Sequence, residues 1–222
     1  MPDDLTRWVE RLFRDRALAK MGHAQRPEQL DLGLGWIYYG LARLAKPERV
    51  VVIGSHRGFA PMVFARALAD NGEGGRVVFV DPSMVDDFWK EPARVQAHFA
   101  EYGLDNIDHH AATTQAFVGS ADWHRLGRSV GIVLVDGYHT EEQARIDHEA
   151  FDPLLAPGGY CLFHDSVRER TSRIYGADRP YRHTVKRYMH ALRADPGFEV
   201  LALPFGDGLC IVRRAVDVED GA

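Results

Sequence analysis

The chain has 222 residues, 45% of them hydrophobic, and a formal net charge of -5. Because its 27 basic and 32 acidic side chains are mixed along the sequence, no broad positive surface for nucleic acid is expected. The first residues lack the pattern of an export signal and no stretch has the roughly 20 apolar residues of a membrane span, so we expect a cytoplasmic protein that binds neither nucleic acid nor membrane.

The first 48 residues predict a helical flank, with apolar residues at helical spacing near 5–13 and again from about Leu34 to Ala45. From residue 49 onward, strand-like and helix-like patterns alternate, which is typical of a parallel sheet covered by helices on both faces. Strands are expected at Arg49–Ile53, Arg76–Val80, Ile132–Val135 and Tyr160–Phe163, and helices at Ala60–Ala69, Pro92–Tyr102 and about Glu141–Leu155.

The end of the pattern is different. Two apolar runs, Glu199–Leu203 and Leu209–Arg213, are joined by a turn-rich spacer that is too short for a helical crossover, so these strands should be antiparallel neighbours. We therefore predict one domain over residues 1–222, with a helical flank at 1–48 and a core at 49–214. That core is expected to be an α/β, Rossmann-like, doubly wound and mostly parallel sheet that ends in an antiparallel hairpin.

A turn with two glycines follows the first strand, at residues 54–58 (GSHRG). Glycines four apart let the backbone approach a ligand and leave the first N–H groups of the next helix free. The spacing is not G-x-G-x-x-G, which makes a nicotinamide-dependent oxidoreductase the weaker alternative. Asp81 ends the next strand, where an acidic side chain can reach the hydroxyls of a ribose bound over the turn; alternatively, it caps the turn with Pro82 and Ser83.

Two carboxylates and two histidines are predicted at one edge of the sheet. Asp136 follows the strand that ends at Val135 and stands three residues before His139, while His164 and Asp165 close the next strand. Ligands bind at the carboxyl ends of parallel strands, so this group suggests a reaction centre. Alternatively, Asp136 caps the following helix, and His164 and Asp165 form a structural pair.

In this order, the motifs resemble those of a class I S-adenosylmethionine-dependent methyltransferase, and most of all its small-molecule O-methyltransferase branch, which includes macrolide-sugar enzymes. The resemblance covers about residues 30 to 214 and rests on VIGSHRGF at 52–59, Asp81, VLVDGYH at 133–139, LLAPGG at 154–159 and FHD at 163–165. It implies methylation of a hydroxyl on a small-molecule acceptor, either a natural product or a sugar. Helical flanks on this fold often mediate dimers, so the resemblance also allows a homo-oligomer.

The resemblance also implies a site for S-adenosylmethionine. The residues implied are Gly54, Ser55 and Gly58 at the amino-acid end of the cofactor, Asp81 at its ribose and Thr113 at its adenine. Many relatives carry an acid two residues before the first glycine, where this chain has Val52. That departure leaves open a non-catalytic cofactor-binding or regulatory domain of the same fold.

Related sugar O-methyltransferases bind a metal at the matching strand ends and use a histidine three residues after the first acid as base. The resemblance therefore implies Asp136 and Asp165 as ligands of Mg²⁺, with His164 or Ser166 and water to complete the shell, and His139 as a catalytic base that acts with Asp136. A metal-free enzyme with His139 or His164 as base is the alternative. The segment 168–183, rich in Arg and Tyr, is expected to form either a lid over the acceptor or a solvated loop.

Overall fold

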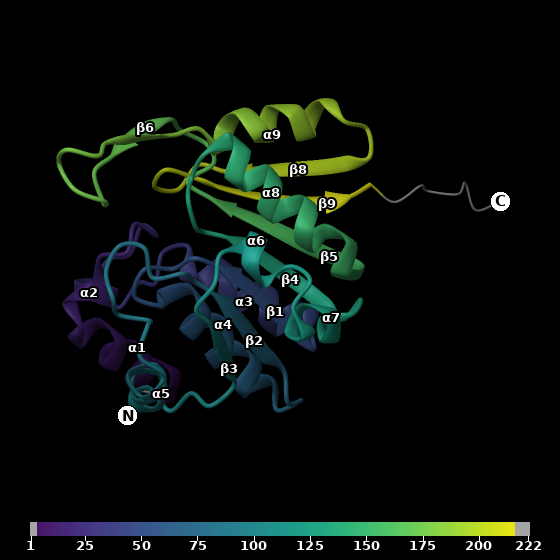
Figure 1. Cartoon of the computed structure of the whole chain (residues 1–222). Coiled ribbons are helices and arrows are strands. Elements are labelled where there is room, and N and C mark those ends of the chain that lie inside the picture. Colours follow the sequence, from purple (N-terminus) through teal and green to yellow (C-terminus); the bar gives the residue numbers. More distant parts are fainter. Residues whose placement is uncertain (1–3, 216–222) are drawn as a thin grey trace.

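The computed structural model describes residues 4–215 and contains the predicted α/β sheet (Figure 1). The strands of the main sheet are β1 (Arg49–Ile53), β2 (Arg76–Val80), β3 (Ile107–His110), β4 (Val130–Val135), β5 (Leu155–His164), β8 (Phe198–Leu203) and β9 (Leu209–Arg214). Within the described residues they form a seven-stranded sheet in the order β3-β2-β1-β4-β5-β9-β8. Strands β1 to β5 are parallel, and β9 runs antiparallel to both β5 and β8, so the predicted terminal hairpin is confirmed.

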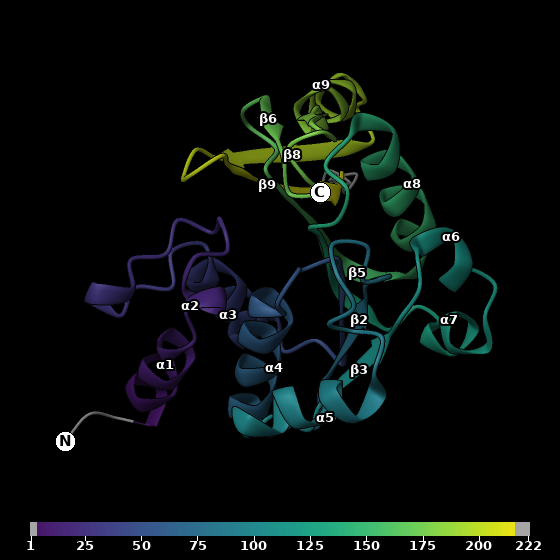
Figure 2. The ribbon, with the colours of Figure 1, turned by 60° about the vertical axis from the view of Figure 1, so that its left-hand side comes forward.

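Helices cover both faces of this sheet. They are α1 (Asp4–Arg14), α2 (Arg16–Ala19), α3 (Gly35–Ala45), α4 (Phe59–Asn71), α5 (Pro92–Glu101), α6 (Thr114–Phe117), α7 (Ala121–Leu126), α8 (Glu141–Phe151) and α9 (Val185–Ala194), with 3₁₀ turns at η1 (Pro27–Gln29) and η2 (Asp152–Leu154). Figures 1 and 2 show α1, α3, α4 and α5 on one face and α6 to α9 on the other.

Successive residues of each strand point to opposite faces of the sheet, so alternate residues pack into the two hydrophobic cores. Val50 and Val52 pack in the core on the side of α3 and α4, whereas Val51 and Ile53 pack in the core on the side of α8 and α9. This burial on both faces fixes the register of the strands, so that their carboxyl ends meet along one edge.

The boundary between α8 and β5 differs from the prediction. The helix expected over Glu141–Leu155 ends at Phe151, because Pro153 has no N–H to continue it, and the chain tightens into η2. Strand β5 then begins at Leu155 rather than at residue 160. Its pairing with β4 shifts between Val130 and Ile132, which leaves residues 156–159 as a bulge.

For segment 168–183 the sequence predicts either a lid or a solvated loop. The segment contains an antiparallel hairpin of β6 (Arg170–Ser172) and β7 (Tyr181–His183), which form a separate two-stranded sheet. In Figure 1 this hairpin projects beyond the carboxyl edge of the main sheet. The hairpin therefore stands where the predicted lid was expected.

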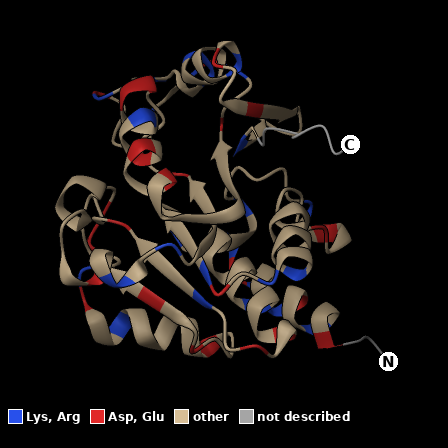
Figure 3. Ribbon diagram, turned by 90° about the vertical axis from the view of Figure 1, so that its right-hand side faces the viewer, with Lys and Arg blue, Asp and Glu red and all other residues tan. Residues whose placement is uncertain are grey.

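Charges are mixed on the outside of the molecule. Figure 3 shows Lys and Arg interspersed with Asp and Glu over the helices that it presents. Several of these residues pair with each other, as in the 2.6 Å contact between Arg76 Nη2 and Asp108 Oδ1. No helix in the described part of the chain is long and apolar enough to cross a membrane.

Candidate active site

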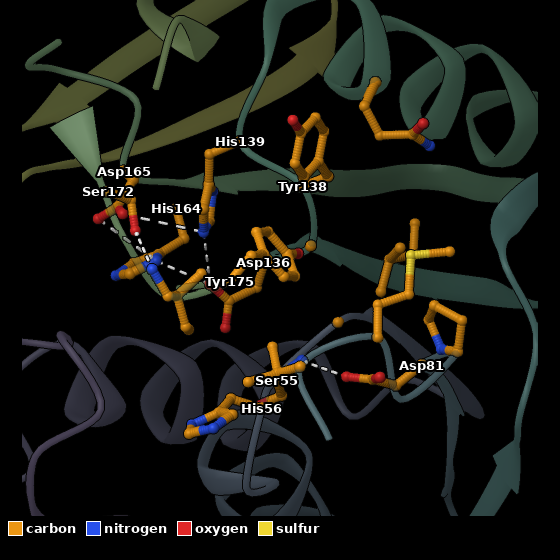
Figure 4. Close-up of a pocket in the computed structure, with 18 of the residues that line it drawn as sticks. Ser55, His56, Asp81, Asp136, Tyr138, His139, His164, Asp165, Ser172 and Tyr175 are labelled. Carbon is orange, nitrogen blue, oxygen red and sulfur yellow. Dashed lines mark hydrogen bonds and ion pairs between the residues drawn. The ribbon is translucent and has the colours of Figure 1, made fainter. Parts of the chain in front are cut away.

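A cavity of about 580 Å³ opens at the carboxyl edge of the sheet. Its walls come from the turn after β1, the end of β2, the start of α6, the ends of β4 and β5, and the β6–β7 hairpin. This is where the strand order reverses between β1 and β4, the usual position of a ligand in an open α/β sheet. Figure 4 shows Ser55 and Asp81 on one side of the cavity and Asp136, His139, His164 and Asp165 on another.

The glycines of the turn have different roles. Gly54 has a φ of 70° and lines the cavity, and a Cβ there would lie 2.4 Å from the Cα of Gly137 after β4. Gly58 has a φ of 85°, begins α4 and faces the ring of Trp89, so it shapes the turn without lining the cavity. Val52 lies fully buried in the core, so an acid at that position would not reach the cavity without repacking.

Asp81 is held by two backbone groups. Ser83 N donates to its Oδ1 at 2.7 Å, and Ser55 N donates to its Oδ2 at 3.2 Å. The carboxylate thus caps its own turn, as the second interpretation expects, and also ties β2 to the turn after β1. Burial raises the pKa of Asp81. Thr113 also lines the cavity, and its side chain accepts a hydrogen bond from Ala116 N to cap α6.

The structure brings the predicted acids and histidines together. Asp136 Oδ1 lies 2.7 Å from His164 Nδ1 and 3.9 Å from His139 Nε2. His139 Nε2 also lies 3.8 Å from Asp165 Oδ2. The cap of α8 is the side chain of Thr140, not that of Asp136, so the Asp136 carboxylate is free to face the histidines.

Two further histidines join the cluster. His23, in the loop after α2, places Nε2 3.4 Å from Asp136 Oδ2, and His183, at the end of β7, places Nδ1 3.0 Å from Asp165 Oδ2. Sequence reasoning did not identify His23, because it belongs to no motif and reaches the site only through the fold of the helical flank. His183 fell within the expected lid, and only the pairing of β6 with β7 turns it toward Asp165.

The electrostatics of the cluster follow from burial and close opposite charges. Burial lowers the pKa of His139 to about 4, which keeps it neutral at pH 7. Burial also opposes the charge of His164, but the carboxylates of Asp136 and Asp165 outweigh it and raise the pKa of His164 to about 9. In the same way the histidines around Asp136 overcome its burial and hold its pKa well below the usual range.

Asp165 is already balanced by protein cations. Arg170 Nη2 donates to Asp165 Oδ2 at 2.5 Å, and Arg170 Nε pairs with Asp207 at 2.8 Å. The Asp136 carboxylate is flanked by imidazoles instead. Mg²⁺ prefers a shell of oxygen ligands, so the donors present do not fit the predicted magnesium site.

A buried acid at the other end of the cavity was also missed by sequence reasoning. Asp147 of α8 accepts hydrogen bonds from Thr114 Oγ1 at 2.5 Å and from Gln143 Nε2 at 2.8 Å. Burial raises the pKa of Asp147 to about 6. Its helical spacing from Gln143 was the available signal, but a lone acid on a helix is more often solvated.

Aromatic rings form the wall nearest the hairpin. The ring of Tyr138 stacks on that of Tyr181 at 4.5 Å and 14°, and Tyr175 lies 5.9 Å from Tyr138. The stack continues from Tyr181 to His183 and from His183 to His139, at 4.9 and 4.6 Å. A row of ring side chains therefore leads from the hairpin to the candidate base.

Comparison with known proteins identifies the family. A family model described as a methyltransferase domain matches residues 51–166. An O-methyltransferase from Bacillus cereus in complex with SAH is similar in structure, with a TM-score of 0.64, 18% identity, and coverage of 97% of this chain and 93% of that one. The O-methyltransferase TomG from Streptomyces achromogenes, in complex with SAM and involved in tomaymycin synthesis, has a TM-score of 0.55, 20% identity, and coverage of 97% and 92%.

The chain also matches part of a much longer protein in sequence. An uncharacterized protein of Sinorhizobium fredii, y4gI, is 30% identical over 155 residues, which are 65% of this chain and 16% of that protein. The chain thus spans about a sixth of the length of the curated relative that it matches. The family model, in contrast, covers more than half of the chain. The chain therefore belongs to the methyltransferase domain family and has the fold of the class I S-adenosylmethionine-dependent methyltransferases.

Proposed function

We propose that the protein is an S-adenosylmethionine-dependent O-methyltransferase that acts on a hydroxyl of a small natural product or sugar. The observation that carries the proposal is the continuous cavity that joins the turn after β1 and Asp81 to the side chain of His139. Membership of the methyltransferase family supports the reaction type. The similarity to TomG supports a natural-product acceptor.

The residues at the Asp81 end suit the nucleoside part of the cofactor. The Asp81 carboxylate ends β2 and faces the cavity, so it can accept hydrogen bonds from the ribose hydroxyls. Two backbone N–H groups fix its orientation before any ligand binds. Gly54 presents no side chain, which leaves room for the amino-acid part of the cofactor beside the turn.

The residues at the His139 end suit the removal of a proton. In the proposed reaction the acceptor oxygen attacks the methyl carbon of the sulfonium, the carbon–sulfur bond breaks, and its electron pair stays on sulfur. The acceptor proton moves to His139, which burial keeps neutral and therefore able to accept it. Asp136 and Asp165, at 3.9 and 3.8 Å from Nε2, stabilise the charged imidazole that results.

The aromatic wall supports an acceptor with a flat or apolar face. Tyr138, Tyr175 and Tyr181 line the cavity beside His139, together with the half-exposed Ile174. Both an aromatic ring and the apolar face of a sugar can stack on such rings. Because magnesium does not fit the donors around Asp136 and Asp165, no step of the proposal depends on it.

Calorimetry and a turnover assay test the proposal. We expect S-adenosylmethionine to bind, and its methyl group to be transferred to at least one hydroxyl compound in a panel of aromatic natural products and sugars. Binding without transfer to any acceptor would favour a non-catalytic domain. Binding of NADH in place of S-adenosylmethionine would favour an oxidoreductase, and either result would contradict the proposal.

A further inference from the structure

Two buried histidines flank the Asp136 carboxylate, one at each oxygen. His164 Nδ1 lies 2.7 Å from Oδ1, and His23 Nε2 lies 3.4 Å from Oδ2. The side chains of His23, Asp136 and His164 are 1%, 6% and 4% exposed. The three residues come from the loop after α2, the end of β4 and the end of β5, so the fold alone assembles them.

Each imidazole is held at its other nitrogen. His164 Nε2 lies 3.3 Å from the carbonyl oxygen of Gly22, and His23 Nδ1 lies 3.1 Å from the hydroxyl of Tyr38. A carbonyl oxygen only accepts, so Nε2 of His164 carries a proton, and a cation that binds at Nδ1 would displace the second proton that the nearby carboxylates favour there. Outer hydrogen bonds of this kind orient histidines that bind metal ions.

The His164 nitrogen that faces Asp136, Nδ1, does not form a hydrogen bond with the carboxylate. His164 Nδ1 has no hydrogen-bond partner among the described residues, because its close contact with Asp136 lacks the alignment of a hydrogen bond. A buried polar atom without a partner is destabilising, and a bound cation would satisfy it. One donor atom from each of His23, Asp136 and His164 lies within 4.8 Å of the other two, so small side-chain shifts would bring all three to about 2.1 Å from one cation.

Neighbouring charges favour a cation at Asp136 over one at Asp165. Asp165 contacts the guanidinium of Arg170, which would repel a second cation. Among residues 4–215, no Lys or Arg forms an ion pair with Asp136. The predicted ligand Asp165 is thus the less suitable of the two acids.

We propose that His23, Asp136 and His164 form a site of two histidines and one carboxylate for a divalent cation such as Zn²⁺, Co²⁺ or Fe²⁺, in preference to Mg²⁺. Imidazole nitrogen suits these ions, whereas Mg²⁺ takes oxygen ligands. Asp136 and His164 line the cavity, which provides a path of entry. The role of the cation rests on the proposed function. In that reaction a cation at this site would lower the pKa of an acceptor hydroxyl, while His139 stays free as the base.

Co²⁺ is the probe for the test, because its visible absorption reports nitrogen ligands directly. The full chain, stripped of metal, should bind one equivalent of Co²⁺ with a visible absorption band, and calorimetry should find no saturable Mg²⁺ binding at the same concentrations. His23→Ala and His164→Ala should lose the band. Tyr38→Phe, which removes only the outer partner of His23, should weaken Co²⁺ binding by about 10- to 100-fold. His190→Ala, on the exposed surface of α9, should change nothing.

Asp165→Asn distinguishes this site from the predicted one and should keep the Co²⁺ band. Loss of the band in Asp165→Asn but not in His23→Ala would overturn the inference, as would absent Co²⁺ binding or equally tight Mg²⁺ binding by the unmodified chain. Binding of the demethylated cofactor is measured separately, in metal-free buffer. It tests the proposed function independently of the metal site, and a variant that binds the cofactor is folded. A chain that binds Co²⁺ but not this cofactor would refute the proposed function alone. If His23→Ala does not fold, Tyr38→Phe tests the role of His23 instead, and unchanged Co²⁺ binding in that variant would overturn the inference.

Discussion

At the Asp81 end of the cavity the contacts come from the backbone, whereas at the Asp136 end they come from side chains. Asp81 is held by the N–H groups of Ser55 and Ser83, which lie within two neighbouring turns. The histidines around Asp136 and Asp165 come from the N-terminal flank, the ends of two strands and the β6–β7 hairpin. The first end needs only the pairing of β1 with β2, whereas the second needs segments from the whole chain.

This difference separates binding from chemistry. In the proposed function a backbone turn positions the cofactor, and the requirements of that turn are conformational. A cluster of side chains from distant segments can be changed one residue at a time, and its requirements are chemical. Changes at one end should therefore leave the function of the other largely intact, and the predictions below test that independence.

The largest effect is expected at His139. Replacing it by Ala removes the group that takes the acceptor proton, and loss of a general base lowers turnover by about 10²- to 10⁴-fold. Binding of S-adenosylmethionine, measured by calorimetry, should stay unchanged, because His139 lies at the other end. Unchanged turnover would contradict the assignment, and His190→Ala serves as the surface control.

The next largest effect concerns the backbone of the turn. A Cβ at Gly54 would meet Gly137 Cα at 2.4 Å, and the φ of 70° is unfavourable for other residues. We expect Gly54→Ala to lower the free energy of unfolding by about 2–5 kcal/mol. Gly103 has a nearly identical φ of 71° with open space around it, so Gly103→Ala should cost only about 1 kcal/mol. Equal losses in urea unfolding would show that the close approach to Gly137 does not matter.

A smaller effect is expected for Asp81→Ala. A hydrogen bond to a charged group contributes about 1.5–3 kcal/mol, so the dissociation constant for S-adenosylmethionine should rise by about 10- to 100-fold. Turnover at saturating cofactor should fall far less, because His139 is untouched. Asp81→Asn keeps the shape and removes the charge. If Asp81→Ala reduced saturated turnover as strongly as His139→Ala, the two ends would not be independent.

The most restricted effect, seen only as the pH changes, is expected at Asp147. Burial raises its pKa to about 6 in the folded protein, from about 3.8, so the folded state binds the proton more tightly than the unfolded state. Stability from this group is therefore full below about pH 4 and is lost as the pH rises through about 6. Asp147→Asn keeps an acceptor for Thr114 and should gain stability relative to the unmodified chain between these pH values, by up to about 3 kcal/mol.

Urea unfolding of both proteins at low and neutral pH measures this gain. The gain should come from the titration alone, so the difference between the two proteins should be flat above about pH 7. A difference that does not change with pH would show that Asp147 titrates normally.

The sequence predicted those features that depend on local pattern. Strands β1 and β2 were predicted at the observed residues, because their burial on both faces gives continuous apolar runs. The grouping of Asp136 with Asp165 followed from the shared edge of parallel strands. The β6–β7 hairpin was not resolved into strands, since each has only three residues and their pairing depends on the neighbouring site.

The rest depended on tertiary contacts. His23 reaches Asp136 because the loop after α2 folds over the end of β5, where Gly22 O meets His164, and no spacing in the sequence encodes that approach. Arg170 cancels the charge of Asp165, which makes a predicted metal ligand unsuitable. Gly58 fits the glycine pattern but faces Trp89, because the residues after β2 cover it.

A crystal structure with S-adenosylhomocysteine bound tests the central claim most directly. We expect the ribose hydroxyls to lie against Asp81 and the sulfur to point toward His139. A nucleoside bound elsewhere, or a sulfur directed away from the histidine cluster, would contradict it.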